Sequence, residues 1–105
     1  MDAQLKAKWV AALRSGKYRK GIGQLKQRVI TAASARTTYC CLGVLCRIEP
    51  EAAKSTKGGT FIDDRTAKQL GFTLGGPRAQ LALSRLNDDF GKSFKQIADY
   101  IEENF

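Results

Sequence analysis

Residues 39–48 read Tyr-Cys-Cys-Leu-Gly-Val-Leu-Cys-Arg-Ile, an almost unbroken run of apolar side chains. A helix built from this stretch is apolar nearly all round, and such a helix belongs at the centre of a hydrophobic core. We expect Thr37 or Thr38 to cap its start. The helix should end before Pro50, because the residue preceding a proline is pushed out of the helical conformation.

Amphipathic helices are predicted at both ends of the chain, because in each the apolar residues recur with the spacing of one helix face. The faces consist of Leu5, Trp9, Ala12 and Leu13 in the first helix and of Phe94, Ile97, Ala98 and Ile101 in the last. Gly16 suits the left-handed end of the first helix. Ser93 and Gln96 form a capping box at the start of the last helix.

Short strands and loops are predicted between these helices. Residues 24–30 and 60–62 are candidate strands, and we expect them to contribute a small sheet or hairpin. Residues 31–36 are small and polar and should form a loop. Residues 51–59 are rich in Lys, Ser, Thr and Gly, which is typical of a surface loop.

Two further helices are predicted in the second half of the chain. Asp63 or Asp64 can cap a short helix that stops at Gly71. Pro77 suits the first turn of another helix, which reaches Asn87. The predicted fold is therefore α+β and mainly α, with the apolar helix at its centre and the two terminal helices packed on it.

The composition indicates one folded domain spanning residues 1–105. Hydrophobic residues make up 43% of the chain and charged residues 27%, which is ordinary globular usage. No apolar run approaches the roughly 18 residues needed to cross a bilayer, so we expect neither a signal peptide nor a membrane anchor. The three cysteines lie within seven residues, at 40, 41 and 46, and there is no histidine. We therefore expect reduced thiols in a cytosol, with no structural zinc and no other cofactor.

The lack of histidine also argues against an enzyme. Histidine is the commonest general base near neutral pH, and its absence excludes catalytic triads and Cys-His pairs. The adjacent acids Asp63 with Asp64 and Asp88 with Asp89 suit helix caps and turns better than acid-base catalysis. Cys40 could be a low-pKa thiol at a helix start, but simple burial is favoured. We expect a non-enzymatic protein.

The positive charge is concentrated in the first half of the chain. Residues 1–48 hold ten Lys and Arg against one acid, a local charge of +9, whereas residues 49–105 hold eight against nine, a charge of −1. A basic half can be no more than a solubilising surface. Because like charges in one segment repel one another, we favour a phosphate-bearing or otherwise anionic partner.

The strongest candidate binding cluster surrounds one tyrosine. Tyr18 lies between Lys17 and the pair Arg19 and Lys20, and Arg28 follows shortly after. A base could stack on Tyr18 while Arg19, Lys20 and Arg28 neutralise phosphate charge. The alternative is that Tyr18 packs on the core beneath a solvated basic turn.

Two weaker candidates lie in the second half. Arg78 follows a Gly-Gly-Pro turn, and the start of a helix with a cation attached attracts anions, although the same residues can form a plain turn. Asn87 and Asp88 end a predicted helix and could recognise polar groups of a ribose or a base. The expected ligand is thus a nucleotide-type small molecule.

Several stretches resemble a family of small bacteriophage and prophage proteins. The stretches are residues 9–18, residues 39–46, and the segments Leu86-Asn87-Asp88, Gly91-Lys92-Ser93-Phe94 and Ile97-Ala98-Asp99-Tyr100-Ile101-Glu102. Together they hold 31 of the 105 residues. The sequence departs from the family pattern at Lys20, where Gln is usual, and at Arg47, where an acid is usual.

The resemblance implies a phage origin and action in the cytoplasm of a host bacterium. Small phage proteins without catalytic residues often counter host defence, so the leading hypothesis is sequestration of an immune signalling nucleotide. Two alternatives stay open, a nucleic-acid-binding protein and an inhibitor of a host protein with an acidic surface. The protein could also form a homo-oligomer.

Overall fold

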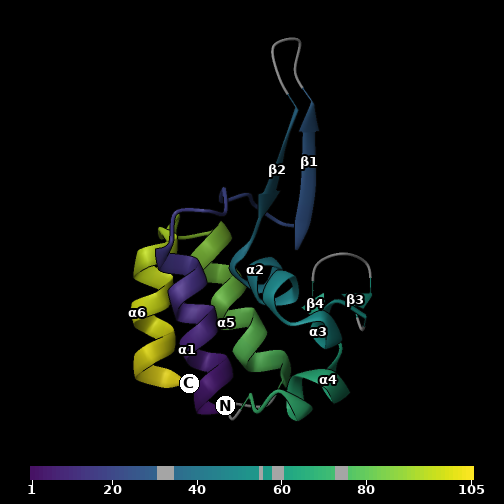
Figure 1. Ribbon diagram of the computed structural model, residues 1–105, viewed down its shortest axis with the longest axis vertical. Coiled ribbons are helices and arrows are strands. Elements are labelled where there is room, and N and C mark those ends of the chain that lie inside the picture. The colour runs from purple at the N-terminus through teal and green to yellow at the C-terminus, as the bar shows by residue number, and fades with distance from the viewer. Residues whose placement is uncertain (31–34, 55, 58–60, 73–75) are drawn as a thin grey trace.

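The protein is a mainly helical body from which one hairpin projects along the long axis (Figure 1). The computed structural model describes residues 1–30, 35–54, 56–57, 61–72 and 76–105. The molecule measures 43 × 26 × 24 Å along its principal axes. The predicted α+β, mainly α class is confirmed.

The described residues form six helices and four short strands. The helices are α1 (Ala3–Arg14), α2 (Cys41–Ile48), α3 (Pro50–Lys54), α4 (Asp64–Gln69), α5 (Gly76–Asp88) and α6 (Phe94–Asn104). The strands are β1 (Lys26–Ile30), β2 (Ala35–Tyr39), β3 (Thr56–Lys57) and β4 (Phe61–Ile62). β1 pairs with β2 and β3 with β4, both antiparallel, in two separate two-stranded sheets.

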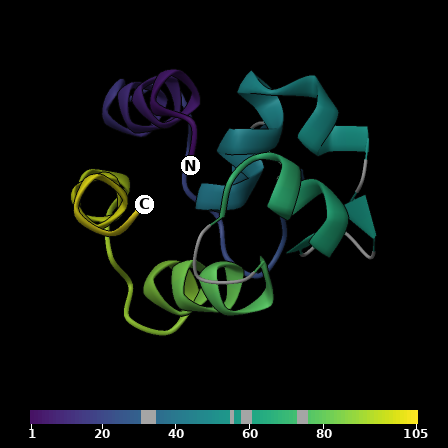
Figure 2. The ribbon, with the colours of Figure 1, turned by 90° about the horizontal axis from the view of Figure 1, so that it is seen from below.

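Four helices surround the core. α1 contacts α2 and α6, and α5 contacts the same two helices from the other side, as the view along the bundle shows (Figure 2). α2 is the most buried of these helices, as its sequence predicts, and residues 41–45 are all buried. Trp9 of α1 is 0% exposed, and its indole Nε1 donates a hydrogen bond to the Cys41 carbonyl oxygen at 3.0 Å.

α2 also packs directly against main chain. A Cβ atom at Gly43 would collide with the carbonyl oxygen of Leu25, the residue before β1. Leu25 itself is 5% exposed and belongs to the core. Only glycine at position 43 lets the chain approach α2 this closely, so Gly43 helps to set where the hairpin leaves the body.

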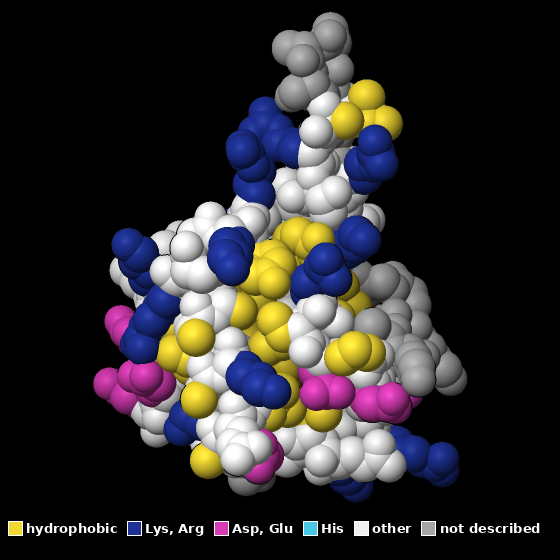
Figure 3. Space-filling view, in the orientation of Figure 1, with side chains coloured by type: hydrophobic (Ala, Val, Ile, Leu, Met, Phe, Trp, Pro, Cys, Tyr) yellow, Lys and Arg dark blue, Asp and Glu magenta, His cyan; other side chains and the backbone are white. Residues whose placement is uncertain are grey.

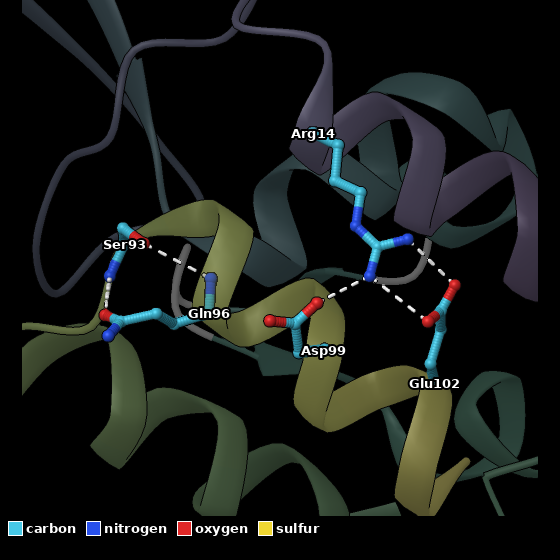
Figure 4. A network of polar contacts seen from close by, with 5 residues as sticks. All are labelled: Arg14, Ser93, Gln96, Asp99 and Glu102. Atoms are coloured by element: carbon cyan, nitrogen blue, oxygen red, sulfur yellow. Dashed lines mark hydrogen bonds and ion pairs between the residues drawn. The ribbon is translucent and has the colours of Figure 1, made fainter.

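Ion pairs join the two terminal helices on the surface (Figure 4). Arg14 Nη1 lies 2.8 Å from Glu102 Oε1, and Arg14 Nη2 lies 2.6 Å from Asp99 Oδ1. The hydrogen bonds to both carboxylates raise the pKa of Arg14, and the bond from Arg14 lowers the pKa of Glu102. The predicted capping box of Ser93 and Gln96 is present at the start of α6.

The prediction for residues 35–39 was wrong, and residues 31–34 of the predicted loop lie outside the described residues. Residues 35–39, which we assigned to a loop and a helix start, form strand β2 opposite β1. α2 therefore begins at Cys41, with Cys40 as its N-cap residue, and neither Thr37 nor Thr38 caps it. β-branched and aromatic residues favour strands, and pairing with β1 decides between the two conformations.

Two smaller predictions were also wrong. The candidate strands near 24–30 and 60–62 do not pair with each other, because each has a nearer partner in sequence. Residues 50–54 form helix α3 rather than a loop, since a proline is well suited to the first turn of a helix. Residues 56–57 of the predicted loop form strand β3. Residues 55 and 58–59 of that loop, and residue 60 of the second predicted strand, lie outside the described residues.

Replacing Gly43 with alanine tests the close packing of α2. The added methyl group meets a main-chain oxygen that cannot move without shifting the hairpin base, so we expect Gly43→Ala to lower the free energy of unfolding by about 3 kcal/mol. Urea unfolding followed by circular dichroism measures the change. Ala11→Ser adds one atom at an exposed position of α1 and should change stability by less than about 0.5 kcal/mol. Equal stability of the two variants would contradict the packing.

Candidate functional site

The segment between α1 and β1, residues 15–25, carries the candidate binding cluster and is named the connector. Its second residue, Gly16, is in the left-handed conformation, with φ of 77°. Its middle pairs with the end of β2, where the Tyr39 amide donates to the Arg19 carbonyl at 2.8 Å and the Gly21 amide donates to the Tyr39 carbonyl at 2.7 Å. A side chain at Gly21 would collide with Thr38. The connector is thus joined to the base of the hairpin.

A buried asparagine holds the connector from the other side. Asn87 is 0% exposed, and its Nδ2 donates to the Gly21 carbonyl at 2.9 Å and to Asp88 Oδ1 at 2.7 Å. Its Oδ1 accepts a hydrogen bond of 3.3 Å from the Cys41 amide at the start of α2. One side chain therefore links α5, the connector and α2.

Lys20 and Asp88 complete this junction. Lys20 Nζ donates to the main-chain carbonyl of Asn87 at 2.7 Å, and Asp88 Oδ1 accepts from the Gly23 amide at 3.1 Å. The structure does bring Lys20, Asn87 and Asp88 together, as a binding site for one ligand requires. Their polar atoms, however, bind one another and the connector, so this geometry gives them a structural role.

Tyr18 of the connector packs at the base of the hairpin. Its ring packs edge-to-face on Tyr39 of β2, with centroids 5.5 Å apart and an interplanar angle of 89°. Both rings are half-buried and contact the edge of the core. Tyr18 thus packs on the body, as the alternative interpretation holds, and keeps part of its ring exposed.

The register of the hairpin brings cations to the same side as these rings. Lys26 lies opposite Tyr39 and Arg28 lies opposite Thr37, and directly opposed residues of an antiparallel pair project to the same face. This face, with Tyr18 packed at its base, is named the tyrosine face. Arg36 lies opposite Val29 and projects to the other side of the ribbon. Sequence reasoning missed Tyr39 and Arg36, because it placed both outside a strand.

Exposed cations cover the hairpin and the connector (Figure 3). Between residues 15 and 48 the chain has seven Lys and Arg and no acid. Six of these cations are exposed, and five of the six lie on the connector and the hairpin, namely Lys17, Arg19, Lys26, Arg28 and Arg36. Within the described part of the chain, none of the five forms an ion pair. Their charges are free to attract an anion.

Arg78 cannot be placed in this surface. Its main chain belongs to the first turn of α5, and its side chain lies outside the described residues.

The cysteines have the properties of buried structural thiols. Burial raises the pKa of Cys40 and of Cys41, and it raises the pKa of Cys46 to about 11. At neutral pH all three thiols are protonated, so the geometry favours burial over the alternative of a reactive Cys40. Among the described residues no three His, Cys, Asp or Glu side chains gather as metal ligands would.

Fold and site together define a small mainly helical α+β protein with a projecting basic hairpin. The chain matches the model of the family described as a domain of unknown function, DUF8296, over residues 1–73, and it belongs to that family. The matched residues include the connector and the whole hairpin, whereas Asn87 lies beyond them. Neither the curated proteins nor the solved structures include a significant match. None of the described helices is both long and apolar enough to cross a membrane.

Asn87→Ala tests the junction beneath the connector. The substitution leaves the Cys41 amide and the Gly21 carbonyl without their partners, so we expect it to lower the free energy of unfolding by about 3 kcal/mol. Chemical denaturation measures this loss. Asp89→Ala removes an exposed neighbour and should cost less than about 0.5 kcal/mol. A loss below about 1 kcal/mol for Asn87→Ala would show that the hydrogen bonds contribute little.

Alkylation of Cys46 by iodoacetamide tests the effect of burial on its thiol. Because only the thiolate reacts, the rate in the folded protein should rise with pH to a midpoint near 11. In urea the midpoint should return to about 8.5. Because the pKa of Cys46 is higher in the folded than in the unfolded protein, the stabilisation linked to this thiol is fully present below the unfolded pKa. It is lost as pH rises toward 11. A folded-state midpoint at or below 8.5, assigned by peptide mass spectrometry, would contradict the environment described.

Proposed function

We propose that this protein is a non-enzymatic nucleic-acid-binding protein whose connector and β1–β2 hairpin hold the phosphate backbone. The observation that carries the proposal is the set of five exposed cations on these two segments, which have no ion-pair partner among the described residues. Lysine and arginine that neutralise phosphates supply most of the affinity of non-specific nucleic-acid binding.

The distribution of the cations favours an extended polyanion. Lys26 and Arg28 lie two residues apart on one face of the ribbon, a spacing of about 6.8 Å, and Arg36 lies on the opposite face. The ribbon projects from the body, so a long ligand can reach both faces (Figure 1). A chain of phosphates matches a row of separated cations better than a single small anion does.

A small nucleotide, the ligand favoured by the sequence, finds less support. A sequestering protein needs convergent polar groups around its ligand. Of the residues expected to provide them, Asn87 is buried with its amide engaged, and the ammonium group of Lys20 is bound to the Asn87 carbonyl. We therefore favour nucleic acid over a signalling nucleotide.

The resemblance to small phage proteins supports a setting for this activity. We infer that the protein acts in the cytoplasm of an infected bacterium, where a nucleic-acid-binding protein could interfere with a host defence complex. The same basic surface could contact an acidic host protein, and the binding experiment below separates these partners.

Fluorescence anisotropy with labelled oligonucleotides tests the proposal. The wild-type protein should bind at low salt, with an affinity that falls linearly on a log-log plot against salt concentration. Lys26→Gln/Arg28→Gln should weaken binding at least about tenfold at low salt and make the slope shallower by about 1.5, because two phosphate contacts are lost.

The matched control is Arg65→Gln/Lys68→Gln. It also removes one arginine and one lysine, but from exposed positions of α4, at the end of the body away from the hairpin (Figure 1). This variant should bind as the wild type does. Equal losses of affinity in the two double variants would show that net charge, and not the position of the cations, determines binding. The absence of binding to any oligonucleotide at low salt would refute the proposed function.

A further inference from the structure

We propose that the ligand of the tyrosine face is single-stranded nucleic acid, with an unpaired base stacked at the Tyr18–Tyr39 corner and the adjoining phosphates held by Lys26 and Arg28. This inference rests on the proposed function and goes one step further, since cations alone do not distinguish a single strand from a duplex.

The first argument is the geometry of the aromatic corner. The two rings meet edge-to-face, with their centroids 5.5 Å apart, so they are not stacked face to face on each other. Neither ring is fully buried. In the space-filling view, hydrophobic side chains gather at the foot of the hairpin with Lys and Arg on both sides (Figure 3).

The second argument is the order of side chains along the ribbon. Tyr39 and Lys26 are directly opposed, with Cβ atoms expected about 5 Å apart, and the pair Thr37 and Arg28 follows two residues farther out. A base stacked on Tyr39 would thus lie beside Lys26, and Arg28 would lie two residues farther along the same face of the ribbon. Proteins that bind single strands combine aromatic rings and a basic track in this way.

The third argument is that polar groups on this face are unused. Within the described part of the chain, the hydroxyl groups of Tyr18, Tyr39 and Thr37 have no hydrogen-bond partner. They can therefore donate to or accept from the edge of a base or a sugar. In a duplex the base faces are covered by their neighbours, so a stacking corner selects unpaired bases.

The test compares oligonucleotides that carry the same phosphates with and without bases. Three labelled probes of about 12 nucleotides are used, a deoxythymidine strand, an abasic strand and a duplex. In anisotropy titrations at fixed salt, the wild type should bind the thymidine strand about tenfold more tightly than the abasic strand. The thymidine strand should also bind more tightly than the duplex.

Variants at Tyr39 assign this preference to the ring. Tyr39→Leu should abolish the preference for bases and keep the salt-dependent binding, whereas Tyr39→Phe should retain it. Phe90→Leu is the control, because Phe90 is an aromatic residue 66% exposed outside the tyrosine face, and its removal should leave the preference intact. Thermal unfolding followed by circular dichroism confirms that each variant is folded.

Failure of this inference is distinct from failure of the proposed function. If the wild type binds thymidine and abasic strands equally, or the duplex more tightly, while Lys26→Gln/Arg28→Gln still weakens binding, phosphate recognition stands and the stacking corner is refuted. This comparison uses the wild-type protein, so it holds even if Tyr39→Leu does not fold. If no probe binds at low salt, both proposals are refuted together.

Discussion

The hydrogen bonds of the buried Asn87 side chain are the constraint on which the position of the basic surface depends. They join the end of α5 to the connector and to the first turn of α2, three segments far apart in sequence. A buried amide is costly unless its donors and acceptor are satisfied, so the three segments must meet in one geometry. The connector, fixed in this way, then pairs with Tyr39 and sets the direction in which the hairpin leaves the body.

The hydrophobic core and the proposed binding surface lie in two different parts of the molecule. The four helices around the core bury the apolar residues, including Trp9, Leu42 and Leu83. The hairpin contributes little to that core, and a lone two-stranded hairpin in water is marginally stable. Its attachment through Leu25 and Gly21 compensates for this. This attachment lets the hairpin carry several cations that form no ion pair with the described residues, and the proposed phosphate ligand would relieve their mutual repulsion.

Local signals predicted the helices well and the hairpin poorly. The stripe and capping box of α6, the Asp63 cap of α4 and the apolar character of α2 are properties of neighbouring residues, and each is present in the structure. Residues 35–39 lack such a signal, because their alternation becomes meaningful only beside β1. The assignment of Asn87 to ligand recognition met the same difficulty, since an exposed and a buried asparagine look identical in a sequence.

The sequence by itself determined the mainly helical class, the central place of α2 and the concentration of positive charge in the first half of the chain. These properties follow from composition and helical periodicity, which need no knowledge of distant contacts. Only the tertiary structure decided that Tyr39 and Lys26 share a face and that Asn87 lies beneath the connector. Strand pairing and buried hydrogen bonds join residues that are remote in sequence, so their partners become known only when the chain has folded.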